Sequence, residues 1–255
     1  MPEVEPMAKS AKELEKIDMK LHMPVERPVT VYLNGVEIVT IQTSLGFLEE
    51  LAAGFLVAEG ILAGADDLRK ITVDERKGMV WVEAKGSKEI AGQMVGKRFL
   101  TSGCGKGFSF SNPGDLRGLG VIESSFKISK GRLTELMKEV LIEGRRPGLH
   151  CSALADLDGI VALRHDIGRH NTVDMLVGHL FLSGRSGGGL VMMTTGRISY
   201  EMAVKAAKAK IPVIATRSAA TDLAVEVSEK IGVEVAGYVR GRDVVVYTNL
   251  GRVAD

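Results

Sequence analysis

The sequence has little cysteine and no long apolar run. Its 255 residues include only two cysteines, Cys104 and Cys151, whose surroundings share no spacing pattern. This scarcity argues against a disulfide framework and indicates a reducing compartment, so we expect a cytoplasmic protein. No apolar run reaches the roughly 18 residues of a membrane span, and residues 1–20 lack the apolar core of a signal peptide. We therefore expect neither export nor a membrane partner.

The sequence also has no excess of positive or negative charge. The 33 Lys and Arg residues nearly balance the 32 Asp and Glu residues, which leaves a formal net charge of +1 at pH 7. No overall basic field would attract nucleic acid, so we expect no nucleic-acid partner, and any recognition by charge must be local. The length suits one large domain or two of ordinary size.

The first part of the chain predicts a small α+β unit. Residues 1–23 are expected to form a flexible leader. An Asn-Gly turn at residues 34–35, between two alternating apolar segments, indicates a β-hairpin over residues 29–41. Ser44 is placed to cap a helix that runs to about Leu62. The apolar residues at helical spacing are expected to face the core: Phe47, Leu48, Leu51, Phe55, Leu56 and Ile61.

A long glycine-rich loop follows two further short strands, which are expected near residues 71–73 and 79–84. Periodicity is absent between about residues 96 and 120, and a loop of this length in a compact protein is usually functional or disordered. Cys104 lies among glycines that let the backbone approach a reactant. The nearby cations Lys97, Arg98 and Lys106 favour thiolate over thiol. These features suit a sulfur-carrying nucleophile, although an inert cysteine in a solvated turn would have the same composition.

The second part of the chain alternates strands and helices. A helix is expected after Ser129, ends near Gly144 and links the two parts. Further strands are expected at residues 150–155, 160–164, 190–194 and 211–216 and in a pair ending near residue 248, with helices at residues 171–182, 200–210 and 222–231. This alternation predicts an α/β layer with a largely parallel sheet.

Four polar turns are candidate sites for a ligand with several phosphates. Two of them, residues 196–199 and 217–221, place arginine and hydroxyl groups at helix N-termini after a strand, where open α/β sheets bind phosphate. Residues 165–171 precede another helix, and residues 240–243 form a basic turn. Ordinary helix caps with solvated arginines are the alternative interpretation.

Cys151 and three histidines have simpler interpretations. Cys151 begins an apolar strand and is expected to be a buried small hydrophobe. His150, His165 and His170 lie at strand ends or in the following loop, but no Cys-x-x-Cys or His-x-x-x-His spacing accompanies them. We interpret them as hydrogen-bonding groups and predict no metal site.

One run of residues resembles the signature of a known family. Residues 164–171, Arg-His-Asp-Ile-Gly-Arg-His-Asn, followed by Asp174, are similar to the Asp-Val-Gly-Arg-His-Asn signature of the FdhD family. Further similar motifs occur in the family order: Glu49-Glu50-Leu51-Ala52, Gly54-Phe55-Leu56, Glu59-Gly60-Ile61, Gly196-Arg197 with Ser199 and Glu201, Ala206-Ala207, Ile211-Pro212-Val213, Leu223-Ala224-Val225, Val239-Arg240-Gly241 and Tyr247-Thr248. The resemblance covers about residues 24–249.

The resemblance implies a fold and an activity. The fold would be α/β, with a cytidine-deaminase-like three-layer domain at residues 129–255 and a smaller N-terminal α+β domain at residues 24–128 that includes the Cys104 loop. The activity would be that of a homodimeric sulfurtransferase, which takes persulfide sulfur from a cysteine desulfurase. The sulfur would pass to the molybdenum (or tungsten) bis-molybdopterin guanine dinucleotide cofactor destined for the catalytic subunit of formate dehydrogenase.

The resemblance also implies roles for particular residues. Cys104 would carry the persulfide, and the turn at residues 238–243 would contact the cofactor. The arginine-bearing turns gain a candidate ligand, because this cofactor carries several phosphates and two guanines, and GDP-like nucleotides are expected at the same site. The candidate cofactor-binding residues are Tyr238, Val239, Arg240, Gly241, Arg242, Asp243, Gly196, Arg197, Ser199, Arg217, Ser218, Arg169 and His170.

The sequence departs from the family pattern at one position. The family commonly has Cys-x-x-Cys in the loop, whereas this chain has Gly107 in place of the second cysteine. A single thiolate can still accept and pass on sulfur, because exchange needs one attacking sulfur and one leaving group at a time. The alternative is a chaperone that binds the molybdenum cofactor for formate dehydrogenase without moving sulfur.

Two other classes of protein are disfavoured. A zinc-dependent deaminase needs a Pro-Cys-x-x-Cys motif, and no cysteine follows Cys151. A plain guanine-nucleotide-binding protein would carry a Gly-x-x-x-x-Gly-Lys-[Ser/Thr] loop, which the sequence lacks.

Overall fold

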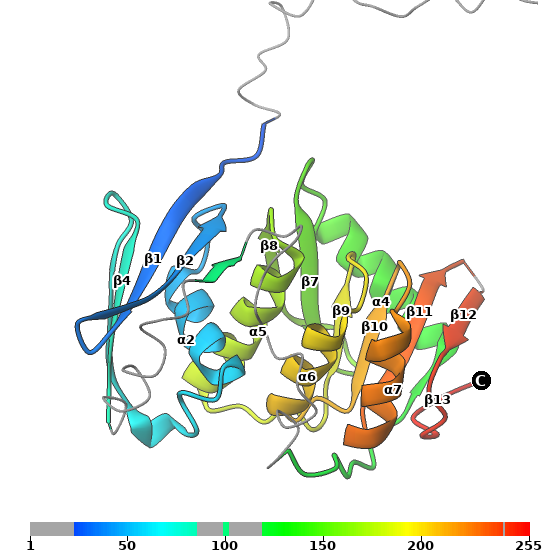
Figure 1. Ribbon diagram of the computed structural model, residues 1–255. Coiled ribbons are helices and arrows are strands. Elements are labelled where there is room, and N and C mark those ends of the chain that lie inside the picture. Colours follow the sequence, from blue (N-terminus) through cyan, green and yellow to red (C-terminus); the bar gives the residue numbers. More distant parts are fainter. Residues whose placement is uncertain (1–22, 86–98, 102–118, 242) are drawn as a thin grey trace, which may run out of the picture.

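The computed structural model describes residues 23–85, 99–101, 119–241 and 243–255, which form a mixed α/β fold with two main β-sheets (Figure 1). The expected leader up to residue 22 and most of the Cys104 loop lie outside these residues. Within the described part of the chain, no helix is long and apolar enough to cross a membrane.

The N-terminal strands form a five-stranded sheet in the order β3-β4-β1-β2-β5. The strands are β1 (Arg27–Leu33), β2 (Val36–Thr43), β3 (Leu68–Asp74), β4 (Met79–Ala84) and β5 (Phe99–Thr101). β1 and β2 are the expected antiparallel hairpin, whose turn residues Asn34 and Gly35 have φ values of 49° and 84°. These left-handed conformations suit a two-residue hairpin turn, so the Asn-Gly prediction is confirmed.

Strand β5 lies within the segment that was expected to be irregular. It pairs in parallel with β2 and places Thr101 beside Ile41. The prediction of residues 96–120 without regular structure is therefore wrong at residues 99–101. Three residues are too few to show a period, so only the tertiary partner defines this strand.

Helix α2 (Leu48–Ala58) covers this sheet but begins later than predicted. Its N-cap is Phe47, which has a φ of 52° and whose side chain is 52% exposed. Ser44 instead donates its backbone N–H to a carboxylate oxygen of Asp166 at 2.8 Å. The predictions of a Ser44 cap and a buried Phe47 are wrong, because Ser44 is engaged by a partner far away in the sequence.

Helix α2 also ends earlier than predicted, at Ala58 instead of Leu62. Gly60 has a φ of 75°, a left-handed conformation that ends the helix. A short 3-10 turn (Ala65–Asp67) then leads into β3. Apart from Phe47, the predicted core residues are confirmed as buried: Leu48, Leu51, Phe55, Leu56 and Ile61.

The second sheet has six strands in the order β12-β11-β10-β9-β7-β8. The strands are β7 (His150–Ala155), β8 (Ile160–Asp166), β9 (Val191–Thr194), β10 (Val213–Thr216), β11 (Glu234–Arg240) and β12 (Asp243–Val246). Only β9, β10 and β11 pair in parallel; the β7–β8, β7–β9 and β11–β12 pairs are antiparallel. The prediction of a largely parallel sheet is therefore wrong, because the chain reverses directly between β7 and β8 and again between β11 and β12.

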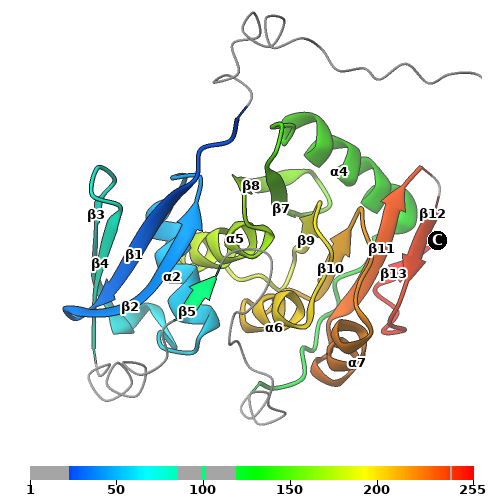
Figure 2. The same ribbon diagram turned by 45° about the horizontal axis from the view of Figure 1, so that its top comes forward.

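Helices cover both faces of the second sheet (Figure 2). α5 (Arg169–Ser183), α6 (Tyr200–Lys208) and α7 (Asp222–Ile231) pack on one face, and α4 (Lys130–Glu143) packs on the other. Alternate residues of a strand point to opposite faces: in β9, Met192 contacts the three-helix core and Met193 contacts the core beneath α4. The sheet is thus buried on both sides.

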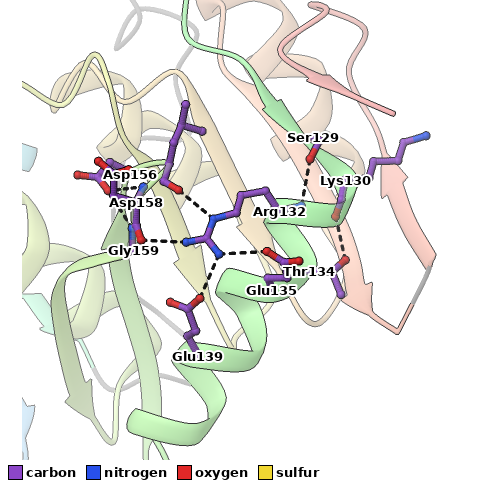
Figure 3. Close-up of polar contacts among 10 residues, drawn as sticks. Ser129, Lys130, Arg132, Thr134, Glu135, Glu139, Asp156, Asp158 and Gly159 are labelled. Carbon is purple, nitrogen blue, oxygen red and sulfur yellow. Dashed lines mark hydrogen bonds and ion pairs between the residues drawn. The ribbon is translucent and has the colours of Figure 1, made fainter.

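Helix α4 begins as predicted at Ser129, whose hydroxyl accepts a hydrogen bond from the backbone N–H of Arg132 at 3.1 Å (Figure 3). The Arg132 side chain then donates to the carbonyl oxygens of Leu157 and Asp158, at 2.9 and 3.1 Å, in the turn between β7 and β8. The short strand β6 (Ile128–Ser129) precedes this helix and pairs with the C-terminal strand β13 (Val253–Ala254). These contacts hold α4 against the second sheet. The helix also links the N-terminal and C-terminal parts of the chain, as predicted.

Helices α2 and α5 cross in close backbone contact and join the two sheets. A Cβ atom on Gly54 would lie 1.7 Å from the carbonyl oxygen of Asp174, and one on Gly178 would lie 1.9 Å from that of Glu50. Only glycine allows this approach, so both glycines position the N-terminal sheet against α5.

Candidate functional site

The loop that leads into α5 is held by one buried carboxylate. Asp166 accepts hydrogen bonds from the Thr43 hydroxyl at 2.5 Å, the backbone N–H of Ser44 and Gly168, both at 2.8 Å, and the Asn171 amide at 2.7 Å. The Asp166 side chain is fully buried. This carboxylate therefore ties the end of β2 to the start of α5.

His170 connects the start of α5 to the start of α6. Its Nε2 lies 3.0 Å from the Ser199 hydroxyl and 3.5 Å from a carboxylate oxygen of Glu201. Burial, with help from the nearby charges of Lys205 and Arg169, lowers the pKa of His170 to about 3. The imidazole is neutral at physiological pH and acts as a hydrogen-bonding group.

Arg169 lies against the turn at residues 196–199. A Cβ on Gly196 would lie 2.9 Å from the Cβ of Arg169, so this glycine makes room for the arginine. The Nε atom of Arg169 is buried and has no hydrogen-bond partner among the described residues. Arg197, on the same turn, is exposed. Arg169 begins α5 and Arg197 precedes α6, so both arginines lie close in sequence to a helix N-terminus.

Backbone hydrogen bonds hold three of the predicted turns side by side. Ile198 donates to Ala219 at 3.0 Å, Thr221 donates to Ile198 at 3.0 Å, and Tyr238 donates to Ser218 at 2.7 Å. The turns at residues 196–199 and 217–221 and the end of β11 thus share one edge of the sheet, and the contact between His170 and Ser199 adds the turn at residues 165–171. This is the edge at which β9, β10 and β11 end, where open α/β sheets bind ligands.

The end of β11 has an unusual backbone. Tyr238 has a φ of 51° at a bulge in the β11–β12 pairing and is 38% exposed. Such a conformation is uncommon and costly for a tyrosine, and strained residues of this kind cluster at ligand-binding sites. The Arg240 guanidinium lies 5.3 Å from the centre of the Tyr238 ring. Val239 between them is fully buried beneath α4 and has no exposed surface.

A buried ion pair joins α5 and α6. Lys205 of α6 lies 2.6 Å from Asp174 of α5, and both side chains are buried. Burial alone would lower the pKa of Lys205, but the Asp174 carboxylate raises it above its ordinary value. Nearby, burial raises the pKa of Glu59 to about 7. Lys205, Asp174 and Glu59 thus form a buried group of ionisable side chains where α2, α5 and α6 meet.

Cys151 is a buried small hydrophobe, as predicted. It is 2% exposed, and burial raises the pKa of its thiol to about 12. Burial also lowers the pKa values of His150 and His165, whose neighbours include Arg169 and Arg146 respectively. In the described ranges, no group of three His, Cys, Asp or Glu side chains is placed to hold a metal ion.

Several predicted residues lie outside the described part of the chain: Cys104, its neighbours Lys97, Arg98, Lys106 and Gly107, and Arg242 of the basic turn. The sequence interpretation missed other residues that the structure brings to the site, namely Asp166, Thr43, Ser44 and Lys205. Asp166 lies within the signature run and could have been identified from that motif. The other three could not, because their partners are distant in the sequence.

These features define a mixed α/β protein with an arginine-bearing sheet edge, and comparisons with known proteins specify it further. Residues 24–254 match the FdhD/NarQ family. The chain is 34% identical over 248 residues to the sulfur carrier protein FdhD of Bacillus subtilis, covering 95% of this chain and 94% of the relative. It is 34% identical over 233 residues to the protein of the same name from Geobacillus kaustophilus, covering 90% and 89%.

A solved structure shares the fold. The crystal structure of a formate dehydrogenase accessory protein from Desulfotalea psychrophila superposes with a TM-score of 0.72, with 22% identity, over 90% of this chain and 89% of that one. The chain described here belongs to the FdhD/NarQ family.

Proposed function

We propose that this chain is a sulfur carrier and sulfurtransferase that supports the maturation of formate dehydrogenase. Cys104 accepts persulfide sulfur from a cysteine desulfurase and passes it to the molybdenum (or tungsten) bis-molybdopterin guanine dinucleotide cofactor. The names of the curated relatives support the sulfur-carrier role, and the name of the solved structure supports the link to formate dehydrogenase.

One observation carries the proposal: the chain enters the Cys104 loop beside the candidate site. Thr101 is paired with Ile41, two residues before Thr43, whose hydroxyl donates to Asp166 of the signature loop. Cys104 follows Thr101 by three residues, so covalent geometry keeps its Cα within about 11 Å of that of Thr101. The loop that carries Cys104 therefore begins next to β2, whose last residue contacts Asp166 of the signature run.

The sheet edge suits the phosphates of the proposed cargo. Arg197 and Arg217 are exposed in the turns that precede α6 and α7, and the buried Nε of Arg169, at the start of α5, is an unused donor. The remaining candidates, Gly196, Ser199, Ser218, His170 and the turn from Tyr238 through Arg240 and Gly241 to Asp243, lie along the same edge. GDP-like nucleotides would use the same contacts, because they share the guanine and diphosphate.

Loading of the sulfur needs only one cysteine, and its delivery to the metal as a sulfide ligand needs, in addition, two electrons from an external reductant. The Cys104 thiolate attacks the terminal sulfur of the desulfurase persulfide, a new S–S bond forms, and the desulfurase thiolate leaves with the electrons of the broken bond. Cys151 is excluded as a second nucleophile by its burial and its raised pKa. A reaction carried by Cys104 alone is therefore consistent with glycine at position 107.

The oligomeric state, the location, the partners and the domain division belong to the same proposal. We infer a homodimer in the cytoplasm that meets a cysteine desulfurase and the catalytic subunit of formate dehydrogenase as partners. We also infer a division into residues 24–128 and a cytidine-deaminase-like domain at residues 129–255.

Mass spectrometry of the full chain tests the sulfur step. After incubation with a cysteine desulfurase and cysteine, we expect one added sulfur on Cys104 that is lost on reduction. Cys104→Ser should abolish the addition, whereas the matched control Cys151→Ala should retain it, because the buried thiol is not a nucleophile. Equal losses in the two variants would contradict the assignment.

The same experiment decides the alternative function. Gly107, which stands where relatives commonly have a second cysteine, favours a chaperone that binds the molybdenum cofactor without moving sulfur. Retained cofactor binding with no sulfur on Cys104 would establish that role in place of sulfur transfer.

A further inference from the structure

A groove lies between helix α7 and the end of strand β12. Its volume is about 530 Å³, and its lining includes Asp222, Leu223, Glu226, Glu229 and Tyr247. The first four residues belong to α7, and Tyr247 directly follows β12. Among the described residues, β12 is the outermost strand of the second sheet, so no further strand covers this side of the groove.

The groove exposes apolar side chains. Leu223 is 52% exposed, and Val245 of β12 is 43% exposed. Alternate residues of a strand point to opposite faces: Val244 and Val246 pack into the core beneath α4, whereas Tyr247 packs into the core beneath α7. Val245 shares the face of Tyr247. Leu223, Val245 and Tyr247 therefore leave apolar surface open on the α7 side of the sheet.

The polar side chains of the groove are all acidic. Asp222, Glu226 and Glu229 follow helical spacing along one face of α7, and no lysine or arginine of the described residues lines the groove. Glu226 pairs with Lys230 at 2.6 Å. Asp222 and Glu229 take part in no ion pair within the described part of the chain. The groove is therefore electronegative and complements a basic partner.

Tyr247 connects the groove to the candidate sheet edge. A Cβ on Gly237 of β11 would lie 2.5 Å from a ring carbon of Tyr247, so the ring packs directly against this glycine. The next residue of β11 is Tyr238, with its left-handed backbone. Burial raises the pKa of the Tyr247 hydroxyl, and hydrogen bonds to the Ala220 backbone and the Tyr238 side chain also act on it. One wall of the groove thus contacts the turn at residues 217–221 and the end of β11.

The place of the groove in the fold favours the protein that receives the cofactor over the protein that donates sulfur. α7 and β12 lie at the opposite end of the molecule from β1 and β4 (Figures 1 and 2). The chain enters the Cys104 loop from β5, which belongs to the same sheet as β1 and β4. A partner in the groove is therefore beside the proposed cofactor edge and away from the N-terminal sheet.

We propose that the groove docks a basic segment of the formate dehydrogenase catalytic subunit. Lysine or arginine side chains of that segment pair with Asp222 and Glu229, and an apolar side chain covers Leu223. The identity of this partner rests on the proposed function, whereas the preference for a basic, partly apolar segment rests on the groove alone.

Binding of the dehydrogenase catalytic subunit, purified without its cofactor, to the immobilised full chain tests the docking site. Glu229→Lys should raise the Kd about tenfold, because like charges then meet across the groove. Glu75→Lys makes the same charge change at an exposed turn between β3 and β4 and should leave the Kd unchanged. Leu223→Ala should raise the Kd about fivefold through lost apolar contact, whereas Leu157→Ala, at a leucine that is also 52% exposed, should not. Groove variants that bind like the native chain, or controls that lose as much affinity, would overturn the proposal.

Salt dependence gives an independent readout. Raising the ionic strength from about 0.05 M to about 0.3 M should weaken binding to the native chain, because exposed charges are then screened. The same change should weaken binding to Glu229→Lys much less. A native Kd that does not respond to salt would overturn the proposal.

Analytical ultracentrifugation tests a second copy of this chain as the occupant of the groove. We expect Glu229→Lys and Leu223→Ala to keep the oligomeric state of the native chain. Dissociation of a native dimer by both variants would assign the groove to the contact between copies and overturn the proposal.

The docking site and the sulfur carrier fail separately. Normal sulfur loading of Cys104, together with dehydrogenase binding that ignores both groove variants, would remove the docking site and keep the sulfur carrier. Groove-dependent binding of the dehydrogenase without any sulfur on Cys104 would do the reverse.

Discussion

Asp166 shows how single residues of the signature run act. It has no exposed surface, yet it accepts hydrogen bonds from four donors that belong to the end of β2 and the start of α5. The sequence predicted the arginines and hydroxyl groups of the site, because those residues occur in turns between strands and helices. It did not predict the role of Asp166, because Thr43 and Ser44 are more than 120 residues away.

We expect Asp166→Ala to destabilise the protein by about 3 kcal/mol, since it leaves several buried donors without an acceptor. Urea unfolding followed by circular dichroism would measure the loss. Glu37→Ala, at an exposed position of β2, is the control and should change the free energy of unfolding by less than about 0.5 kcal/mol. A similar small change for Asp166→Ala would show that Asp166 does not hold the loop.

Glu59 should make stability depend on pH. Burial raises its pKa from 4.5 to about 7 in the folded protein. Because the folded-state pKa is the higher one, the contribution to stability is complete below pH 4.5 and is lost as the pH rises through 7. Glu59→Gln removes this loss, so its stability relative to the native chain should rise by up to about 3 kcal/mol between pH 4.5 and pH 8.

Unfolding curves across this pH range would test the effect. The control Glu229→Gln changes an exposed residue of α7 and should leave the pH profile unchanged. Parallel profiles for Glu59→Gln and the native chain would refute the role given to Glu59.

At the level of helices and strands, predictions that depend on neighbouring residues were confirmed. Predictions that depend on contacts between residues distant in the sequence were wrong. Residues 222–231 were predicted as a helix and form α7 with the same bounds, because Thr221 supplies the cap and Gly232 ends the helix. Strand directions in the second sheet and the start of α2 were predicted wrongly. Both depend on tertiary partners: β7 is antiparallel to β9, and Ser44 is taken by Asp166. Periodicity identifies elements but does not specify which neighbours they will have.

The contact between α2 and α5 gives the strongest prediction for an element. Gly178→Ala would place a Cβ 1.9 Å from the carbonyl oxygen of Glu50, so the helices would have to separate. We expect a loss of about 3 kcal/mol or more in the free energy of unfolding, measured by thermal or urea denaturation. Gly189→Ala, where nothing lies within 4 Å of the added atom, should be nearly neutral. Comparable stability of the two variants would mean that this crossing does not need glycine.

Across the whole molecule, the two sheets contribute different parts of the site that we propose. The N-terminal sheet brings the chain to Cys104 through β5, and the second sheet contributes the arginine-bearing edge. Asp166 and the glycines of α2 and α5 hold these parts together. The sequence predicted both parts, but their meeting depends on contacts between residues far apart in the chain.

Transfer of labelled sulfur tests the central claim most directly. The chain is loaded with ³⁵S from labelled cysteine and a desulfurase, freed of the desulfurase, and mixed with formate dehydrogenase that contains unsulfurated cofactor. We expect the label to leave Cys104, appear in the cofactor and accompany a rise in formate oxidation, with none of these in Cys104→Ser. Activation of the dehydrogenase by Cys104→Ser to the native level, without transfer of label, would contradict the account.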